Sequence, residues 1–112
     1  MPSPVSFNAM SEEGALLCPV CGFPGYSEVP AYTENTGRIG TAICPCCLWE
    51  PGFDDNPLAS AKAKATIRES ILAYRTGWVT TKEWRGQRGL KPDEFDGSKQ
   101  LDAMLKRAPD LR

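Results

Sequence analysis

The chain has 112 residues, a net charge of −1, 41% apolar residues and no histidine. This length and composition suit one compact domain, and no apolar run approaches the length that a membrane-spanning helix needs. Residues 1–7 lack the positive and apolar segments of an export signal. We therefore expect a cytoplasmic protein without a membrane partner.

The chain divides into a short lead-in and one domain. Residues 1–13 are polar and contain two prolines, which predicts a flexible N-terminal lead-in. We expect residues 14–112 to form a single domain, with a four-cysteine part over 14–57 and a helical part over 58–112. Short apolar runs at 15–17, 26–29 and 38–43 predict three strands in the first part.

The cysteine-rich part contains two pairs with the same spacing, in the runs CPVCG and CPCCL. The turn in a C-x-x-C pair lets both sulfurs converge, and two pairs complete a tetrahedral site for one metal ion. In a reducing compartment this spacing favours zinc over disulfides. The predicted Zn²⁺ ligands are Cys18, Cys21, Cys44 and Cys47.

A fifth thiol, Cys46, lies within the second pair, and its position in the turn directs it away from the point where Cys44 and Cys47 converge. We expect Cys46 to be a packed spectator, with ligand substitution or thiol reactivity as the alternatives. Gly22 follows the first pair and supplies a permissive backbone, whereas Leu48 occupies the corresponding position after the second.

Capping patterns predict the first helix. Asn56 as N-cap and Pro57 at the first helical position predict a start, and the helix is expected to run to about Arg75, with Gly77 at its stop. An apolar stripe at helical spacing should bury one face of this helix. The stripe consists of Ile67, Ile71, Tyr74 and Trp78.

Two more helices are expected further along. Thr80 and Glu83 form a capping box that predicts a short helix. Ser98 opens a last helix, which Pro109 ends and whose apolar face contains Leu101, Met104 and Leu105. The sequence thus predicts an α+β fold with a zinc-ribbon-like β head and two or three C-terminal helices.

The two parts carry opposite charge. Residues 1–57 contain one basic and seven acidic side chains, and the remainder contains twelve basic and seven acidic ones. A dication with four thiolates adds a further −2 to the acidic part, so nucleic acid is an unfavourable partner for it. The basic residues between Lys62 and Lys91 are most simply a solvated helix face.

Catalysis has little support in this sequence. Without histidine, Cys–His and Ser–His arrangements cannot form within one chain, and a closed tetrathiolate site keeps no water position. We interpret Asp54 and Asp55 as partners of a helix N-terminus. Four aromatic residues are expected to seat the helices on the β head as core residues, namely Trp49, Phe53, Trp78 and Trp84.

The motifs CPVCGFP, ICPCC and FDD resemble the small bacterial cysteine-rich CPCC-type proteins, whose pattern reads CPVCGYP, EICPCCG and EFGYDD. The resemblance covers about Cys18 to Leu105. It implies zinc bound by the same four cysteines and supplies no activity. The chain departs from the pattern at Leu48, Trp49 and Pro51.

Together, these features favour a non-enzymatic zinc protein whose metal is structural and which acts as a protein-interaction or regulatory module. A rubredoxin-like iron carrier is one alternative, because a tetrathiolate site also accepts iron. Nucleic-acid binding through the basic helical part is the other. We expect the partner to be a protein and not a nucleic acid, since nucleic acid usually requires a more continuous positive field.

Overall fold

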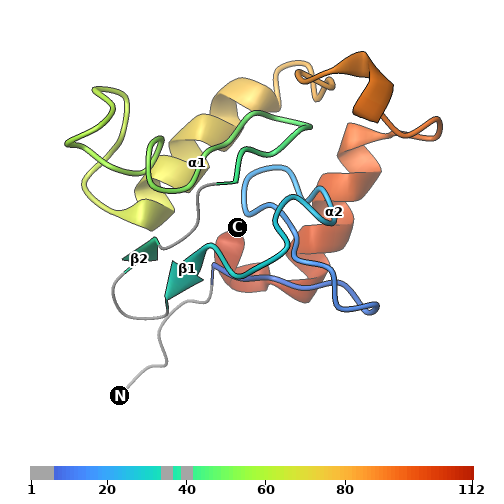
Figure 1. Ribbon diagram of the computed structural model, residues 1–112, viewed down its shortest axis with the longest axis horizontal. Coiled ribbons are helices and arrows are strands. Elements are labelled where there is room, and N and C mark those ends of the chain that lie inside the picture. The colour runs from blue at the N-terminus through green and yellow to red at the C-terminus, as the bar shows by residue number, and fades with distance from the viewer. Residues whose placement is uncertain (1–6, 34–36, 39–41) are drawn as a thin grey trace.

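In the part of the chain that the structure describes, the fold consists of two α-helices, with one long irregular segment before the first helix and a shorter one between the two. The computed structural model describes residues 7–33, 37–38 and 42–112. In chain order these contain β1 (Tyr32–Thr33), β2 (Gly37–Arg38), α1 (Ile67–Trp78), the 3₁₀ helix η1 (Arg88–Leu90), α2 (Gly97–Arg107) and the 3₁₀ helix η2 (Pro109–Leu111). The cysteine-bearing loops pass between α1 and α2 (Figure 1).

The predicted zinc-ribbon-like β head is wrong. In the described part of the chain, β1 and β2 have two residues each and pair only with one another, with Tyr32 opposite Arg38. Residues 15–17 contribute single bridges rather than a strand, and residues 26–29 contain no strand. The third predicted strand, 38–43, lies partly outside the described residues.

Proline explains why the strands do not extend. Leu17 bridges to Pro24, which has no N–H to continue a ladder, and Pro30 closes the predicted second strand at its other end. The backbone N–H groups nearby serve turns and single cross-links. Gly25 N–H donates to the Leu16 carbonyl at 2.8 Å, and Leu17 N–H to the Ala9 carbonyl at 2.7 Å.

Helix α1 begins ten residues later than Asn56 and Pro57 predict. Its N-cap is Thr66, whose hydroxyl accepts from Glu69 N–H at 3.0 Å and donates to the Glu69 carboxylate at 2.9 Å. The Asn56 side chain instead accepts from Leu58 N–H at 3.0 Å, which closes a local turn. The predicted start is therefore wrong, because Thr66 and Glu69 provide the stronger cap.

The apolar stripe of α1 is confirmed. Ile71 and Trp78 are fully buried, and Ile67 and Tyr74 pack against the core at its edge. The helix continues through Gly77 to Trp78, so Gly77 is not its stop.

The chain after α1 differs from the prediction until α2 begins. No α-helix follows Thr80 within the described residues 79–96, which contain only η1. Helix α2 begins at Gly97 with Asp96 as N-cap, one residue before the predicted start. Its apolar face agrees with the prediction, since Leu101 and Met104 are buried.

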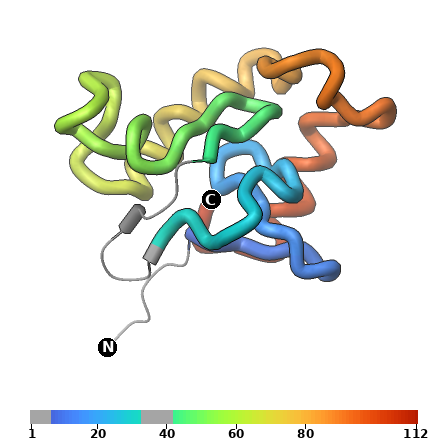
Figure 2. Tube along the Cα trace, viewed as in Figure 1, coloured from blue at the N-terminus to red at the C-terminus, as the bar shows by residue number. Residues whose placement is uncertain are grey.

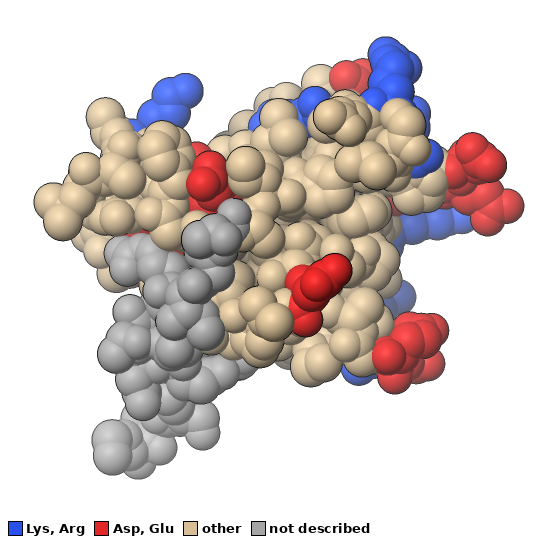
Figure 3. Space-filling model, in the orientation of Figure 1, with Lys and Arg blue, Asp and Glu red and all other residues tan. Residues whose placement is uncertain are grey.

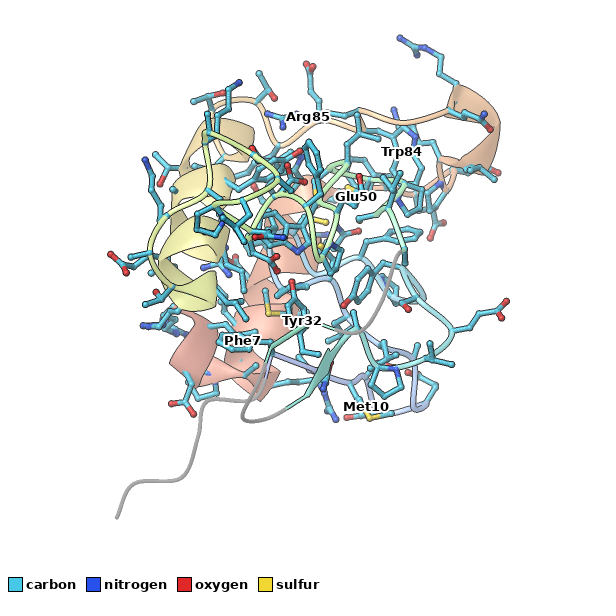
Figure 4. The ribbon with its side chains drawn as sticks, turned by 60° about the vertical axis from the view of Figure 1, so that its left-hand side comes forward. Phe7, Met10, Tyr32, Glu50, Trp84 and Arg85 are labelled. Atoms are coloured by element: carbon cyan, nitrogen blue, oxygen red, sulfur yellow. The ribbon has the colours of Figure 1, made fainter. Side chains whose placement is uncertain are left out.

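The described residues before the first cysteine pair pack on the domain. The ring centroids of Phe7 and Tyr32 lie 5.4 Å apart. Both side chains are labelled in Figure 4. Asn8 donates to the Tyr32 carbonyl at 2.7 Å and accepts from its N–H at 3.2 Å. The predicted flexibility of the lead-in at residues 1–6 lies outside the described residues.

Candidate metal centre

The structure brings the four predicted ligands together. The sulfur atoms of Cys18, Cys21, Cys44 and Cys47 all lie within 4.8 Å of one another. Cys18 and Cys47 are 3.6 Å apart at sulfur, and Cys21 and Cys44 are 3.7 Å apart. All four residues are fully buried.

Each cysteine pair sits in a six-residue loop, which we call knuckle 1 (residues 18–23) and knuckle 2 (residues 44–49). In knuckle 1, Cys18 N–H donates to the Phe23 carbonyl at 3.1 Å, and the Cys18 carbonyl accepts from Gly22 N–H at 2.8 Å. Knuckle 2 repeats both hydrogen bonds at 2.9 and 2.8 Å, between Cys44 and residues 49 and 48. The two loops run beside one another (Figure 2).

The residue after each second cysteine has a left-handed backbone. Gly22 has φ +85°, and Leu48 has φ +68° at the equivalent position. Glycine adopts this conformation without strain, whereas an L side chain pays roughly 1–2 kcal/mol for it. Leu48 therefore carries strain that Gly22 avoids, as expected from the leucine at this position.

The sulfur geometry fits a tetrahedral metal ion. Zinc binds thiolate sulfur at about 2.3 Å, which places two sulfurs of a regular tetrahedron about 3.8 Å apart. Two of the six sulfur separations, 3.6 and 3.7 Å, match that edge, and all six lie within 4.8 Å. Four thiolates also suit both zinc and iron chemically.

The site requires compensating positive charge. Burial raises the pKa of the Cys21 thiol above its ordinary value and does the same for Cys47. Four thiolates cannot persist together in such a site unless a cation lies among them, because each would repel the others with little solvent screening. A bound dication would supply that charge and hold all four in the thiolate form.

A buried arginine provides further positive charge beside knuckle 1. Arg75, on α1, donates from Nη2 to the Pro19 carbonyl at 2.5 Å and from Nε to the Val20 carbonyl at 2.9 Å. Its Nη1 donates to the Leu111 carbonyl at 2.6 Å. Burial lowers the pKa of Arg75, and the charges of Cys18 and Cys21 oppose that effect. Arg75 thus joins α1, knuckle 1 and the C-terminal residues next to the thiol cluster.

Cys46 lies outside the cluster of four. It is buried, and its sulfur accepts from the Gln100 amide at 3.5 Å. The same amide donates to the Cys21 carbonyl at 3.1 Å. Hydrogen bonding with Cys21 lowers the pKa of Cys46, which burial opposes. This packed position agrees with the spectator interpretation.

Knuckle 2 is fastened to two other segments. The Tyr74 hydroxyl on α1 donates to the Cys47 carbonyl at 2.9 Å, and Arg85 N–H donates to the Cys46 carbonyl at 2.7 Å. Gly86 packs so closely on Pro45 that a Cβ there would overlap the proline carbonyl. The segment after α1 is therefore held directly on the cysteine loop.

Several predicted residues have other roles. Asp54 accepts from Glu50 N–H at 2.7 Å and Asp55 from Gly52 N–H at 2.9 Å, so they close a turn and do not cap a helix. Trp49 and Trp78 are buried core residues as expected, and Trp84 is partly buried. Phe53 is 45% exposed, which contradicts its assignment to the core.

Sequence reasoning missed Arg75 and Gln100. A signal for Arg75 was present, because it lies four residues after Ile71 and three before Trp78, on the buried stripe of α1. A cation at such a position indicates a buried partner. Gln100 had no comparable signal, since it adjoins Leu101 on a helix rich in polar residues.

Neither helix of the described residues has both the length and the apolar character that a membrane span needs.

Comparisons with known proteins add one similarity. No family model matches the chain, and no solved structure matches it. A curated protein named "Uncharacterized protein YozI", from Bacillus subtilis (strain 168), is 26% identical over 82 residues. The match covers 70% of this chain and 64% of that relative, less than two thirds of its length. Membership of the CPCC-type proteins stays a prediction.

Proposed function

We propose that the four cysteines bind one Zn²⁺ ion whose role is structural. The observation that carries this proposal is a fully buried set of four sulfurs that all lie within 4.8 Å of one another, two pairs of them at the edge length of a zinc tetrahedron. When bound, the ion cross-links knuckle 1 to knuckle 2. The residues that would hold it are Cys18, Cys21, Cys44 and Cys47.

The packing around the knuckles supports a structural role. Knuckle 1 contacts α1 through Arg75 and α2 through Gln100, while knuckle 2 contacts α1 through Tyr74. With little sheet among the described residues, these loop contacts replace the strand ladder that would otherwise join the elements. A closed tetrathiolate site offers no coordination position for a substrate, which supports a non-enzymatic role.

We further propose that the domain is a cytoplasmic protein-interaction or regulatory module. Reduced thiols are the form that binds metal, and a reducing compartment maintains them. Basic side chains stand beside acidic ones over the segment between α1 and α2 (Figure 3). Such mixed surfaces suit protein partners better than nucleic acid.

Metal analysis tests the structural proposal. Protein purified under reducing conditions should be colourless and should carry one equivalent of zinc per chain by mass spectrometry. A red protein would favour iron. A structural zinc site contributes roughly 10–16 kcal/mol of apparent binding free energy, comparable to or above the stability of a whole domain. Chelation should therefore unfold the protein, as followed by circular dichroism.

Cysteine substitutions provide the matched control. Cys44→Ser should lose metal and fold poorly, whereas Cys46→Ser, two residues away, should keep the full zinc equivalent. Protein with well under one metal equivalent and an unchanged melting curve after chelation would contradict the proposal.

A further inference from the structure

Phe95 lines two hollows, and the first of them borders knuckle 1 at Gly22 and Phe23. The first, of about 460 Å³, is mainly apolar and is bounded by Phe23, Pro92, Phe95 and Met104. The second, of about 470 Å³, includes three basic side chains. Asp96 also lines both hollows, so the two adjoin, and we call the pair the aromatic groove.

Three aromatic rings lie at the border of the two hollows. Phe23 lines the first hollow, Trp84 lines the second, and Phe95 lines both. Trp84 meets Phe23 edge to face at 5.2 Å and Phe95 edge to face at 5.6 Å, the arrangement that aromatic pairs favour. The Trp84 indole N–H donates to the Gln87 carbonyl at 2.8 Å, which fixes the orientation of the ring. The groove is therefore preformed, which lowers the entropic cost of binding.

Both knuckles hold the walls of this groove. Phe23 belongs to knuckle 1, and its carbonyl accepts from Cys18 N–H. Trp84 precedes Arg85, whose N–H donates to the Cys46 carbonyl of knuckle 2. Trp84 and Arg85 are both labelled in Figure 4. Phe23 and Trp84 thus contact each other while each is attached to a different knuckle.

The second hollow is suited to an acidic group. Lys82, Arg88 and Lys91 line it, and none of them forms an ion pair with a carboxylate in the described part of the chain. Lys82 contacts the Ser98 hydroxyl at 3.1 Å, and Lys91 lies 5.9 Å from the centre of the Phe95 ring. The carboxylate of Asp96 is already used to cap α2.

We propose that the aromatic groove binds an extended segment of a partner protein in which a large apolar side chain is followed by acidic residues. This proposal rests on the interaction-module function and names its partner. The apolar side chain would enter the first hollow, and the acidic residues would meet Lys82, Arg88 and Lys91. Each hollow lies within the roughly 300–1,000 Å³ range of small-ligand sites, enough for one or two side chains.

Acidic residues around the groove disfavour nucleic acid. Glu83 and Asp96 line the basic hollow, and Glu13 and Glu94 line the apolar one. A polyphosphate chain crossing the groove would meet all four carboxylates, whereas a short acidic peptide segment confined to the basic hollow would meet three cations and two carboxylates. The charge pattern therefore favours a peptide.

A displayed library of random twelve-residue peptides, selected against the zinc-loaded protein, tests the proposal. We expect enrichment of peptides with a Phe, Trp or Leu next to two or more acidic residues. Synthetic peptides of that consensus should bind with a change in tryptophan emission, because Trp84 is the partly exposed tryptophan while Trp49 and Trp78 are buried.

Surface variants locate the binding site. Arg88→Glu with Lys91→Glu should weaken peptide binding at least tenfold, and Ala103→Trp, on an exposed position that lines the apolar hollow, should weaken it similarly. Lys62→Glu with Lys64→Glu is the matched control, because both lysines are exposed and lie before α1. This control should change binding less than twofold.

Zinc content and melting temperature are measured for every variant, so loss of the metal centre is distinguished from loss of the groove. No enriched motif, or enriched peptides that bind the Arg88→Glu, Lys91→Glu variant equally well, would overturn the proposal while the zinc result stands. Salt-sensitive binding of duplex DNA or RNA in place of peptide would also overturn it. Self-association that depends on Arg88 and Lys91 would assign the groove to a second copy instead.

Discussion

Gly22 is a position where knuckle 1 leaves no room for a side chain beside α2, and it has an internal control in Gly25. Both glycines have left-handed backbones, with φ of +85° and +81°. A Cβ at Gly22 would lie 2.7 Å from the Gln100 carbonyl oxygen and 2.8 Å from the Met104 Cβ. A Cβ at Gly25 would have no heavy atom within 4 Å. Alanine at the two positions therefore differs only in what the methyl group meets.

The difference can be given a magnitude. A left-handed backbone costs an L residue roughly 1–2 kcal/mol, and this cost applies to both variants. Overpacking against α2 adds about 1–3 kcal/mol at Gly22, because the helix backbone cannot move aside as a flexible side chain would. We expect Gly25→Ala to lose about 1–2 kcal/mol and Gly22→Ala to lose roughly 2–5 kcal/mol.

Urea denaturation of both variants at the same excess of zinc measures these free energies of unfolding. The zinc Kd of each variant is measured by chelator competition, and the contribution of the metal, RT ln(1 + [Zn²⁺]/Kd), is subtracted for each protein. Equal destabilisation by Gly22→Ala and Gly25→Ala, within about 0.5 kcal/mol, would show that knuckle 1 does not press on α2 and would refute the reasoning.

Substitutions at three other positions test the surroundings of the thiol cluster. Cys46→Ser should keep full zinc content and cost no more than about 1–2 kcal/mol, since its sulfur lies outside the cluster of four and only hydrogen-bonds with Gln100 and Cys21; metal loss in the mass spectrum would make it a ligand. At Leu48, Asn should be tolerated and Val should be at least about 1 kcal/mol less stable than Asn, because β-branched residues resist positive φ; equal thermal melts would dispute the left-handed backbone. Arg75→Met should cost about 3 kcal/mol or more by leaving three buried carbonyls without a donor. Arg75→Lys should recover part of that loss and of the zinc affinity in a chelator competition, and equal affinities would argue against charge compensation.

The convergence of the cysteines was predictable because it depends on local chemistry. A C-x-x-C turn brings two sulfurs together whatever the rest of the chain does, and the repeated spacing required only that the two turns meet. The role of position 48 was visible for the same reason, since glycine occupies its equivalent in knuckle 1. Such inferences need no knowledge of long-range packing.

The β head was not predictable by the same reasoning. Short apolar runs such as residues 26–29 read as strands, yet strand formation requires a partner with free N–H and carbonyl groups. Pro24 and Pro30 lack the N–H group on either side of this run. The prolines were visible in the sequence, but the pairing that they block depends on which segments become neighbours.

The start of α1 was a choice between two caps. Asn56 with Pro57 satisfies the usual pattern, and Thr66 with Glu69 satisfies a capping box. The tertiary contacts decide, because the buried stripe begins at Ile67 and the residues before it have no apolar face to bury. Conversely, Thr80 with Glu83 starts no helix, since Trp78 fixes the backbone there through an indole hydrogen bond to the Glu83 carbonyl at 2.9 Å.

If zinc binds the four cysteines and a peptide binds the aromatic groove, as proposed, the two binding events should be coupled. Phe23 is part of knuckle 1, and Trp84 precedes Arg85, whose N–H donates to knuckle 2, so both rings are attached to the loops that the ion would join. A peptide that prefers the joined form must raise the zinc affinity by the same factor by which zinc raises the peptide affinity. Arg75 would strengthen this link, because it hydrogen-bonds knuckle 1 to α1. A partner that occupies the groove would therefore slow the loss of metal, and zinc depletion would release the partner.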